Sequence, residues 1–271
     1  MEYNVEFFKL NYWYFAIFSF IFGAAIGSFL NVVIYRLPIP GLSIVKPRSK
    51  CPNCDTPIAG YDNIPILSWF LLRGRCRHCG EKFSFRYAGV ETLTGCVAVL
   101  FFHMTVIGRF SPAAGLIFFL FACALIAITF IDLDHMIIPN QISIPGIPIG
   151  IVLSIFLPVG LLGSVIGAAV GFVSTMAVVY GSLIILKKEG MGLGDVKLLT
   201  MIGAFVGWQG VLMTWFIASL VGSVVGIFTV VIPGKGRNYR IPFGPFLSAG
   251  AVIYILGGDQ LIRWYIELFG G

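Results

Sequence analysis

The stretch MGLGDVK, residues 191–197, places Asp195 between two long apolar runs, residues 163–186 and 198–205. A second stretch, FIDLD at residues 130–134, places Asp132 at the end of another apolar run. An ionisable side chain at the edge of a membrane segment is energetically costly, so each carboxylate is a candidate functional group. The two stretches therefore predict a membrane domain with a pair of acidic residues at helix ends.

The composition is that of a membrane protein. Of the 271 residues, 58% are hydrophobic and only 11% are charged, and the mean hydropathy is +0.95. Soluble globular domains have about a quarter of their residues charged. The net charge of +6 comes from basic residues clustered in loops. This pattern indicates membrane topology and argues against a nucleic-acid partner.

The apolar segments predict an all-α polytopic membrane protein with about eight transmembrane helices. We expect them at residues 12–35, 88–107, 113–131, 141–161, 163–186, 195–207, 211–232 and 243–256. A polar insert, residues 37–87, separates the first two. Gly23 and Gly27 in the first helix, and Gly167 and Gly171 in the fifth, predict close helix–helix approach.

The basic residues predict the orientation of the chain in the membrane. With eight spans, fifteen of the eighteen Lys and Arg residues fall on one side, including those of a basic loop at residues 233–240. The side richer in Lys and Arg is the cytoplasmic one. The insert, Asp132 and Asp195 are therefore all expected at the cytoplasmic face.

The polar insert contains two CxxC motifs, CPNC at residues 51–54 and CRHC at residues 76–79. Two such motifs at this spacing predict one zinc ion held by four thiolates. The predicted ligands are Cys51, Cys54, Cys76 and Cys79. Because four protein ligands leave no open coordination position, the zinc is expected to be structural. The alternative is a pair of disulfides, which a reducing cytoplasm disfavours.

Two carboxylates held close together can share one proton, so that one acts as a base and the other as an acid. Asp132 and Asp195 are candidates for such a pair. The structural alternatives are an N-cap for Asp195 and a hydrated helix-end charge for Asp132. Asp134 competes with Asp132, but residues two apart point to different faces of a helix.

Other polar or sulfur-containing residues lie in the apolar segments. Glu91, near the start of the second span, either pairs with Arg86 or serves a second site. His103 is expected to be a packing residue. Cys96 and Cys123 are expected to be small buried apolar residues.

Several motifs resemble those of the type IV prepilin peptidases. GLGD at residues 192–195, followed by Lys197, resembles the GxGD signature of that family, and Asp132, seven residues before Pro139, resembles its other catalytic aspartate. The stretches GSFLNVVIYRLP at residues 27–38, YDNIPILSW at 61–69 and PFGPF at 242–246 resemble further motifs. The resemblance extends over about residues 27–251.

The resemblance implies a multifunctional enzyme of the bacterial inner membrane, with Asp132 and Asp195 as its catalytic pair. Its substrates would be type IV prepilins or type II secretion pseudopilins, each a single membrane helix with a short basic leader. The leader would be cleaved after a Gly, and the new terminus N-methylated with S-adenosylmethionine. No residues for the methyl donor, and no oligomeric state, are assigned.

This interpretation divides the chain into three parts: a first transmembrane helix (1–36), a cytoplasmic zinc subdomain (37–87) and a GxGD protease membrane domain (88–271). One alternative is a peptidase without methyl transfer. Another is an ion-coupled transporter that uses the same two aspartates, and a third is a membrane scaffold that binds pilus assembly proteins through its zinc insert.

Overall fold

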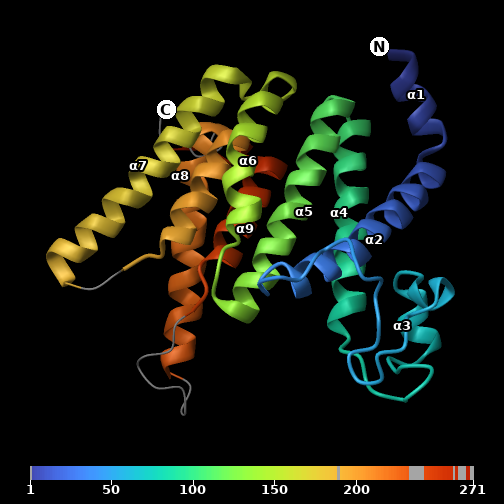
Figure 1. The fold of residues 1–271 in the computed structure, drawn as a ribbon. Coiled ribbons are helices and arrows are strands. Elements are labelled where there is room, and N and C mark those ends of the chain that lie inside the picture. Colours follow the sequence, from blue (N-terminus) through green and yellow to red (C-terminus); the bar gives the residue numbers. More distant parts are fainter. Residues whose placement is uncertain (1, 188–189, 232–240, 259, 262–266, 269–271) are drawn as a thin grey trace. The chain divides into compact units, whose positions relative to one another are not determined.

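The chain folds mainly into helices, as the computed structural model in Figure 1 shows. The structure describes residues 2–187, 190–231, 241–258, 260–261 and 267–268. Within these residues the only β-type pairing is two isolated bridges. The helices group into two units, Met1–Ala127 and Ile128–Gly271, and each is described by itself. The prediction of an all-α fold is confirmed.

The first unit is built on the packing of two long helices. It contains α1 (Glu2–Leu10), α2 (Tyr12–Arg36), α4 (Arg86–Val106) and the first part of α5 (Pro112–His135). α2 packs along α4. A Cβ atom on Gly23 would lie 2.6 Å from the Cβ of Ala98, and one on Gly27 would lie 2.7 Å from the Cα of Glu91. The predicted close approach at these two glycines is confirmed.

The polar insert between α2 and α4 contains little regular structure. Its helices are one turn of 3-10 helix, η1 (Gly60–Asn63), and the short α3 (Leu67–Leu71). Its two isolated bridges join Lys50 to Pro57 and Arg75 to Lys82, so each bridge closes one of the two CxxC motifs.

The second unit is arranged around α8. It contains α6 (Asn140–Leu153), η2 (Ser154–Phe156), α7 (Gly160–Leu186), α8 (Leu193–Val231), α9 (Gly244–Ile253) and η3 (Tyr254–Gly258). Helices α6, α7 and α9 all pack against α8 (Figure 1). The hydroxyl of Ser164 on α7 donates to the carbonyl of Ala204 on α8 at 2.5 Å, which links the two helices directly.

Helix α8 is broken at Gly207, where φ is 76° and ψ is 179°. Glycine adopts this backbone conformation at little steric cost, whereas other residues do not. The break falls where the sixth predicted segment was expected to end. The predicted separation of residues 195–207 from 211–232 therefore corresponds to the two halves of one broken helix.

Two predicted helix ends are wrong. The third segment was expected to end at Ile131, but α5 continues to His135, so Asp132 lies inside the helix and not in a polar break. The fourth segment was expected to reach Leu161, but helical structure stops at Phe156. Leu157 is extended, with φ −100° and ψ 154°, because the ring of Pro158 disfavours a helical residue before it.

Within the part of the chain that the structure describes, five helices are long and apolar enough to cross a membrane: α2, α4, α5, α7 and α8. Two shorter apolar helical segments, Asn140–Phe156 and Gly244–Gly258, accompany them. The chain is therefore a multi-pass membrane protein, while the count of eight crossings stays a prediction. The predicted basic loop at residues 233–240 lies outside the described residues.

The contact between α7 and α8 predicts an effect of adding a single methyl group. A Cβ atom on Gly171 would lie 2.5 Å from the carbonyl oxygen of Leu199. Because backbone atoms cannot move aside easily, we expect Gly171→Ala to lower the free energy of unfolding by about 2 kcal/mol. Thermal denaturation of the purified protein in detergent measures this effect.

Gly181, on the same helix, is the matched control, since a Cβ there meets no atom within 4 Å. Gly181→Ala should leave the protein as stable or slightly more stable, because Ala favours helix over Gly by about 1 kcal/mol. Equal melting temperatures for the two variants would contradict the tight packing of α7 on α8.

Candidate functional site

The four cysteines of the insert converge on one point. The sulfur atoms of Cys51, Cys54, Cys76 and Cys79 all lie within 4.8 Å of one another. The Cys51–Cys79 pair is 3.7 Å apart and the Cys54–Cys76 pair 4.0 Å apart. Two sulfurs bound to one tetrahedral zinc at about 2.3 Å lie about 3.8 Å apart. A disulfide needs about 2.05 Å, so the disulfide alternative does not fit and a metal site does.

The two CxxC motifs have the same local geometry. The Cys51 N–H donates to the Thr56 carbonyl at 3.0 Å, and the Cys76 N–H donates to the Glu81 carbonyl at 2.8 Å. The residue after each second cysteine has a positive φ: 55° at Asp55 and 73° at Gly80. Gly and Asp are residue types that tolerate this conformation. Each turn therefore presents its two thiols to the same side.

Hydrogen bonds favour the thiolate form of two of these cysteines. The side chain and backbone of Thr56 lower the pKa of Cys54 to about 6. The backbone N–H groups of Cys79 and His78 lower the pKa of Cys76. Since the thiolate is the form that binds metal, both effects fit the donor set to zinc.

The cysteine cluster predicts a metal content. The purified protein should carry about one zinc per chain, and Cys76→Ser should lose it. Cys96→Ser is the control, since Cys96 lies on α4 outside the cluster and should keep the zinc. Elemental analysis by mass spectrometry measures the zinc content of each protein. A wild-type protein with no bound metal would contradict the zinc hypothesis.

Asp132 lies in the last turn of α5 and is only 5% exposed. Its Oδ2 accepts a hydrogen bond from the backbone N–H of Gly244, at the start of α9, at 2.9 Å. A helix N-terminus stabilises a negative charge placed beside it. The alternative of a hydrated helix-end charge is therefore wrong, because Asp132 is buried and bound to another helix.

Asp195 lies in the first turn of α8, three residues after Gly192. Its Oδ2 accepts from the Gly192 N–H at 3.3 Å. The helix begins earlier than expected, at Leu193, so Asp195 is not the N-cap residue that the structural alternative required. Its carboxylate instead accepts a hydrogen bond from the N–H of Gly192, the residue before the helix. In a capping box, the side chain of the third helical residue makes the same contact.

Both predicted carboxylates lie in the second unit, Asp132 near the end of α5 and Asp195 in the first turn of α8. An electrostatic interaction links Asp195 to Asp132. Asp134, by contrast, is exposed. Two like charges held together in a partly buried site share a proton more readily than separate ones do. The arrangement can therefore supply one acidic and one basic carboxyl group.

Gly244 contributes to this site, although no chemical role for it could be predicted from the sequence. A Cβ atom on Gly244 would lie 2.6 Å from Oδ2 of Asp132, so only glycine leaves room for the carboxylate. Its motif, a glycine between two Pro-Phe pairs, was visible in the sequence. The contact with Asp132 was not visible, because 112 residues separate the partners.

A second buried carboxylate lies in the first unit. Glu91 on α4 is 8% exposed, and its Oε2 accepts the Ile66 N–H at 2.7 Å. The side chains of Ser28 and Asn31 lie beside this carboxylate. Both expectations for Glu91, a pairing with Arg86 and a second site, stay predictions.

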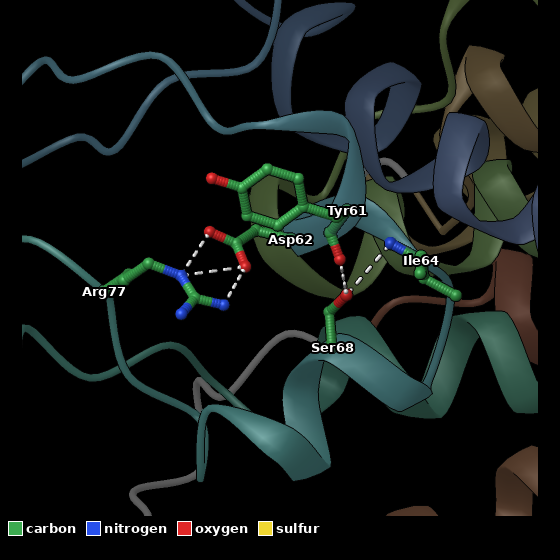
Figure 2. Close-up of polar contacts among 5 residues, drawn as sticks. All are labelled: Tyr61, Asp62, Ile64, Ser68 and Arg77. Atoms are coloured by element: carbon green, nitrogen blue, oxygen red, sulfur yellow. Dashed lines mark hydrogen bonds and ion pairs between the residues drawn. The ribbon is translucent and has the colours of Figure 1, made fainter.

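The loop that carries Ile66 is held in place by polar contacts. Arg77 donates through both Nε and Nη2 to the carboxylate of Asp62, and the Ser68 hydroxyl donates to the Tyr61 carbonyl while accepting the Ile64 N–H (Figure 2). The hydrogen bonds from Arg77 lower the pKa of Asp62. The pair therefore stabilises the loop at any pH above the usual carboxyl range, and is lost only as the pH falls through the lowered value.

The remaining single residues have structural surroundings. His103 Nδ1 lies 3.2 Å from the Tyr12 hydroxyl, which agrees with a packing role. Cys123 is buried as expected. The expectation of burial is wrong for Cys96, which is exposed, because the packed face of α4 contains Gly95 and Ala98 but not position 96.

Together these features define a class: a multi-pass, all-α membrane protein with a four-cysteine insert and two aspartates at helix ends of one unit. Two family models match successive parts of the chain. The bacterial peptidase A24 N-terminal domain matches residues 21–105, and the type IV leader peptidase family matches residues 119–227. No solved structure matches the chain.

Curated relatives match nearly the whole chain. A prepilin leader peptidase/N-methyltransferase of Aeromonas hydrophila is 38% identical over 95% of this chain and 96% of its own length. Proteins of the same name from Myxococcus xanthus and Pseudomonas aeruginosa are 43% and 33% identical, over 82% and 94% of this chain and 65% and 95% of their own lengths. The chain therefore belongs to the type IV leader peptidase family, and the resemblance of its motifs is confirmed.

Proposed function

We propose that the chain is a bifunctional enzyme that cleaves the leader of prepilins or pseudopilins after a Gly and then N-methylates the new terminus. The observation that carries this proposal is that relatives matching nearly the full chain are named prepilin leader peptidase/N-methyltransferase. The two carboxylates that α5 and α8 bring together support the peptidase half.

The proposed hydrolysis uses Asp132 and Asp195 as an acid–base pair. One carboxyl group is ionised and takes a proton from a water molecule, whose oxygen attacks the scissile carbonyl carbon. The other is protonated and gives its proton to the carbonyl oxygen, forming a tetrahedral intermediate. Collapse of this intermediate breaks the C–N bond, and the leaving nitrogen takes up a proton from the pair.

Two backbone N–H groups would orient the pair during the reaction. The Gly244 N–H donates to the Oδ2 of Asp132, and the Gly192 N–H donates to the Oδ2 of Asp195. The second oxygen of each carboxylate is then left for water or the substrate carbonyl. Fixed donors of this kind reduce the reorganisation needed when charge moves in the transition state.

The proposed location follows from the distribution of Lys and Arg. The carboxylate pair and the zinc subdomain (37–87) would lie at the cytoplasmic face of the inner membrane, where the basic leader of a membrane-anchored substrate also lies. The protease membrane domain would be residues 88–271. The four thiolates would hold a structural zinc, which ties the two CxxC turns together.

The second proposed reaction is methyl transfer from S-adenosylmethionine. The new terminal amine, in its neutral form, attacks the methyl carbon of the donor. The C–S bond breaks, the sulfur keeps the electron pair, and S-adenosylhomocysteine is released. The proton that the methylated amine must lose passes to solvent.

Mass spectrometry of a full-length prepilin incubated with the purified enzyme tests both reactions. We expect loss of the leader, and a further gain of one methyl group when S-adenosylmethionine is added. Cleavage without the methyl gain would leave only the peptidase half. No cleavage by folded, zinc-loaded protein would contradict the proposal and favour ion transport, which flux assays in vesicles would detect.

A further inference from the structure

The loop between α5 and α6 connects the helix of Asp132 to the start of α8. α5 ends at His135, three residues after Asp132, and α6 begins at Asn140. The loop, residues 136–139, and the first turn of α8 with Asp195 all belong to the second unit. The loop is therefore placed to relate the position of one aspartate to that of the other.

Hydrogen bonds hold this loop at both ends. Met136 ends the helix with a φ of 54°, while its N–H donates to the Asp132 carbonyl at 2.8 Å. The Pro139 carbonyl accepts from the Ser143 N–H at 3.1 Å and from the Ser143 hydroxyl at 3.1 Å. The loop therefore moves with the two helices that it joins.

One face of the first turn of α8 contacts this loop and the start of α6. A Cβ atom on Gly194 would lie 3.1 Å from the Cβ of Ile138, so the loop packs closely against the α8 backbone there. One turn later, the ammonium group of Lys197 donates to Oδ1 of Asn140 at 2.8 Å. Residues three apart are neighbours on a helix surface, so both contacts are made by the same face of α8.

Asp195 lies between these two contact points in the sequence. Residues one or two apart do not face each other on a helix, so its side chain points away from the face that Gly194 and Lys197 share. The two contacts can therefore fix the turn that carries Asp195 without occupying the space in front of its carboxylate.

The contact between Lys197 and Asn140 is suited to fixing this turn. A hydrogen bond from an ammonium group is charge-assisted and about twice as strong as one between neutral groups. Lys197 is half-buried, whereas Asn140 is exposed. The contact therefore lies at the edge of the helix packing, where replacing Asn140 leaves no cavity in the core.

The geometry of the carboxylate pair depends on how the α5–α6 loop and α8 are joined. Catalytic rates are sensitive to a displacement of about 1 Å in a reacting group. Resting on the peptidase reaction of the proposed function, we propose that Lys197 is a positioning residue. Through its hydrogen bond to Asn140, it holds Asp195 in place relative to Asp132, and it makes no contact with the substrate.

Steady-state kinetics of prepilin cleavage by the full-length, zinc-loaded protein test this role. Lys197→Met keeps an unbranched side chain and removes the donor. We expect kcat to fall about tenfold or more, the usual effect of losing a charged hydrogen bond, with KM within about twofold of the wild-type value. Lys197→Arg, which can still donate to Asn140, should recover most of the activity. Lys187→Met, the same change at an exposed lysine just after α7, should cleave as the wild type does.

The partner of Lys197 allows a second test that leaves α8 unchanged. Asn140→Leu removes the acceptor and should lower kcat about as much as Lys197→Met does. Asn140→Asp keeps an acceptor for the ammonium group and should retain cleavage. The double variant of Lys197→Met and Asn140→Leu should be no slower than either single variant, because both changes break one contact. Melting temperatures check folding, and the two Asn140 variants decide the question if Lys197→Met is unstable.

Failure of this inference and failure of the proposed function give different results. If the wild type cleaves prepilin and Lys197→Met cleaves as fast as Lys187→Met, the positioning role is wrong and the proposed function stands. A higher KM with an unchanged kcat would also overturn the role, since it indicates that Lys197 binds the substrate. Losses that add in the double variant would show that the two residues act independently. If the wild type does not cleave prepilin, the proposed function fails and this inference fails with it.

Discussion

Prepilin cleavage is expected to fall by about three orders of magnitude when either Asp132 or Asp195 is replaced by Asn. The amide keeps the size of each side chain, and its oxygen can still accept from Gly244 N–H or Gly192 N–H. What it loses is the ability to take up and release a proton. Because each carboxyl group has its own part in the proposed mechanism, neither single variant should keep the activity.

Asp134→Asn is the matched control for this experiment. It removes the same charge two residues away from Asp132, on an exposed part of α5. We expect it to cleave prepilin at close to the wild-type rate. Initial rates by mass spectrometry, with zinc content and melting temperature as checks on folding, measure all three variants. Normal cleavage by Asp195→Asn would show that the aspartyl mechanism is wrong.

The second large effect is expected at a residue that has no reactive side chain. In Gly244→Ala, the new Cβ would lie 2.6 Å from Oδ2 of Asp132 and 3.3 Å from its Cγ. Either the carboxylate or the start of α9 must move, and the hydrogen bond between them is lost or distorted. Since misplacing a catalytic group by about 1 Å lowers rates by about a hundredfold, we expect a loss of at least that size.

Gly257→Ala, in η3 of the same unit, is the control, because the nearest atom to its Cβ is the side-chain oxygen of Gln260 at 3.9 Å. It should retain cleavage. Both variants should keep their zinc, since the cysteine cluster belongs to the other unit. A Gly244→Ala enzyme that cleaves as fast as Gly257→Ala would mean that Asp132 does not need its contact with α9.

The helical class and most helix positions could be predicted because they depend on local patterns. An apolar run long enough to cross a bilayer is visible within about twenty residues of sequence. The break at Gly207 also has a local origin, since glycine adopts a positive φ easily. The errors were at helix ends, where the continuation of α5 through Asp132 to His135 was not visible in the apolar pattern.

The two candidate sites differ in how much of each could be predicted from the sequence. The cysteine ligands come in two CxxC pairs, and each pair is already close along the chain, so only one long-range contact had to be inferred. A carboxylate pair requires two helix ends, 63 residues apart in sequence, to meet. The sequence named Asp132 and Asp195 as candidates, but did not exclude an N-cap for Asp195 or a hydrated position for Asp132.

By itself, the sequence determined that this is a membrane protein, and it identified the four cysteines and the two aspartates as candidate site residues. Only the tertiary structure decided what surrounds the carboxylates of Asp132 and Glu91. Gly244 reaches Asp132 across 112 residues, and the Ile66 N–H reaches Glu91 across 25. Such contacts depend on how helices and loops pack, and packing sums many weak interactions over surfaces that no short stretch of sequence encodes.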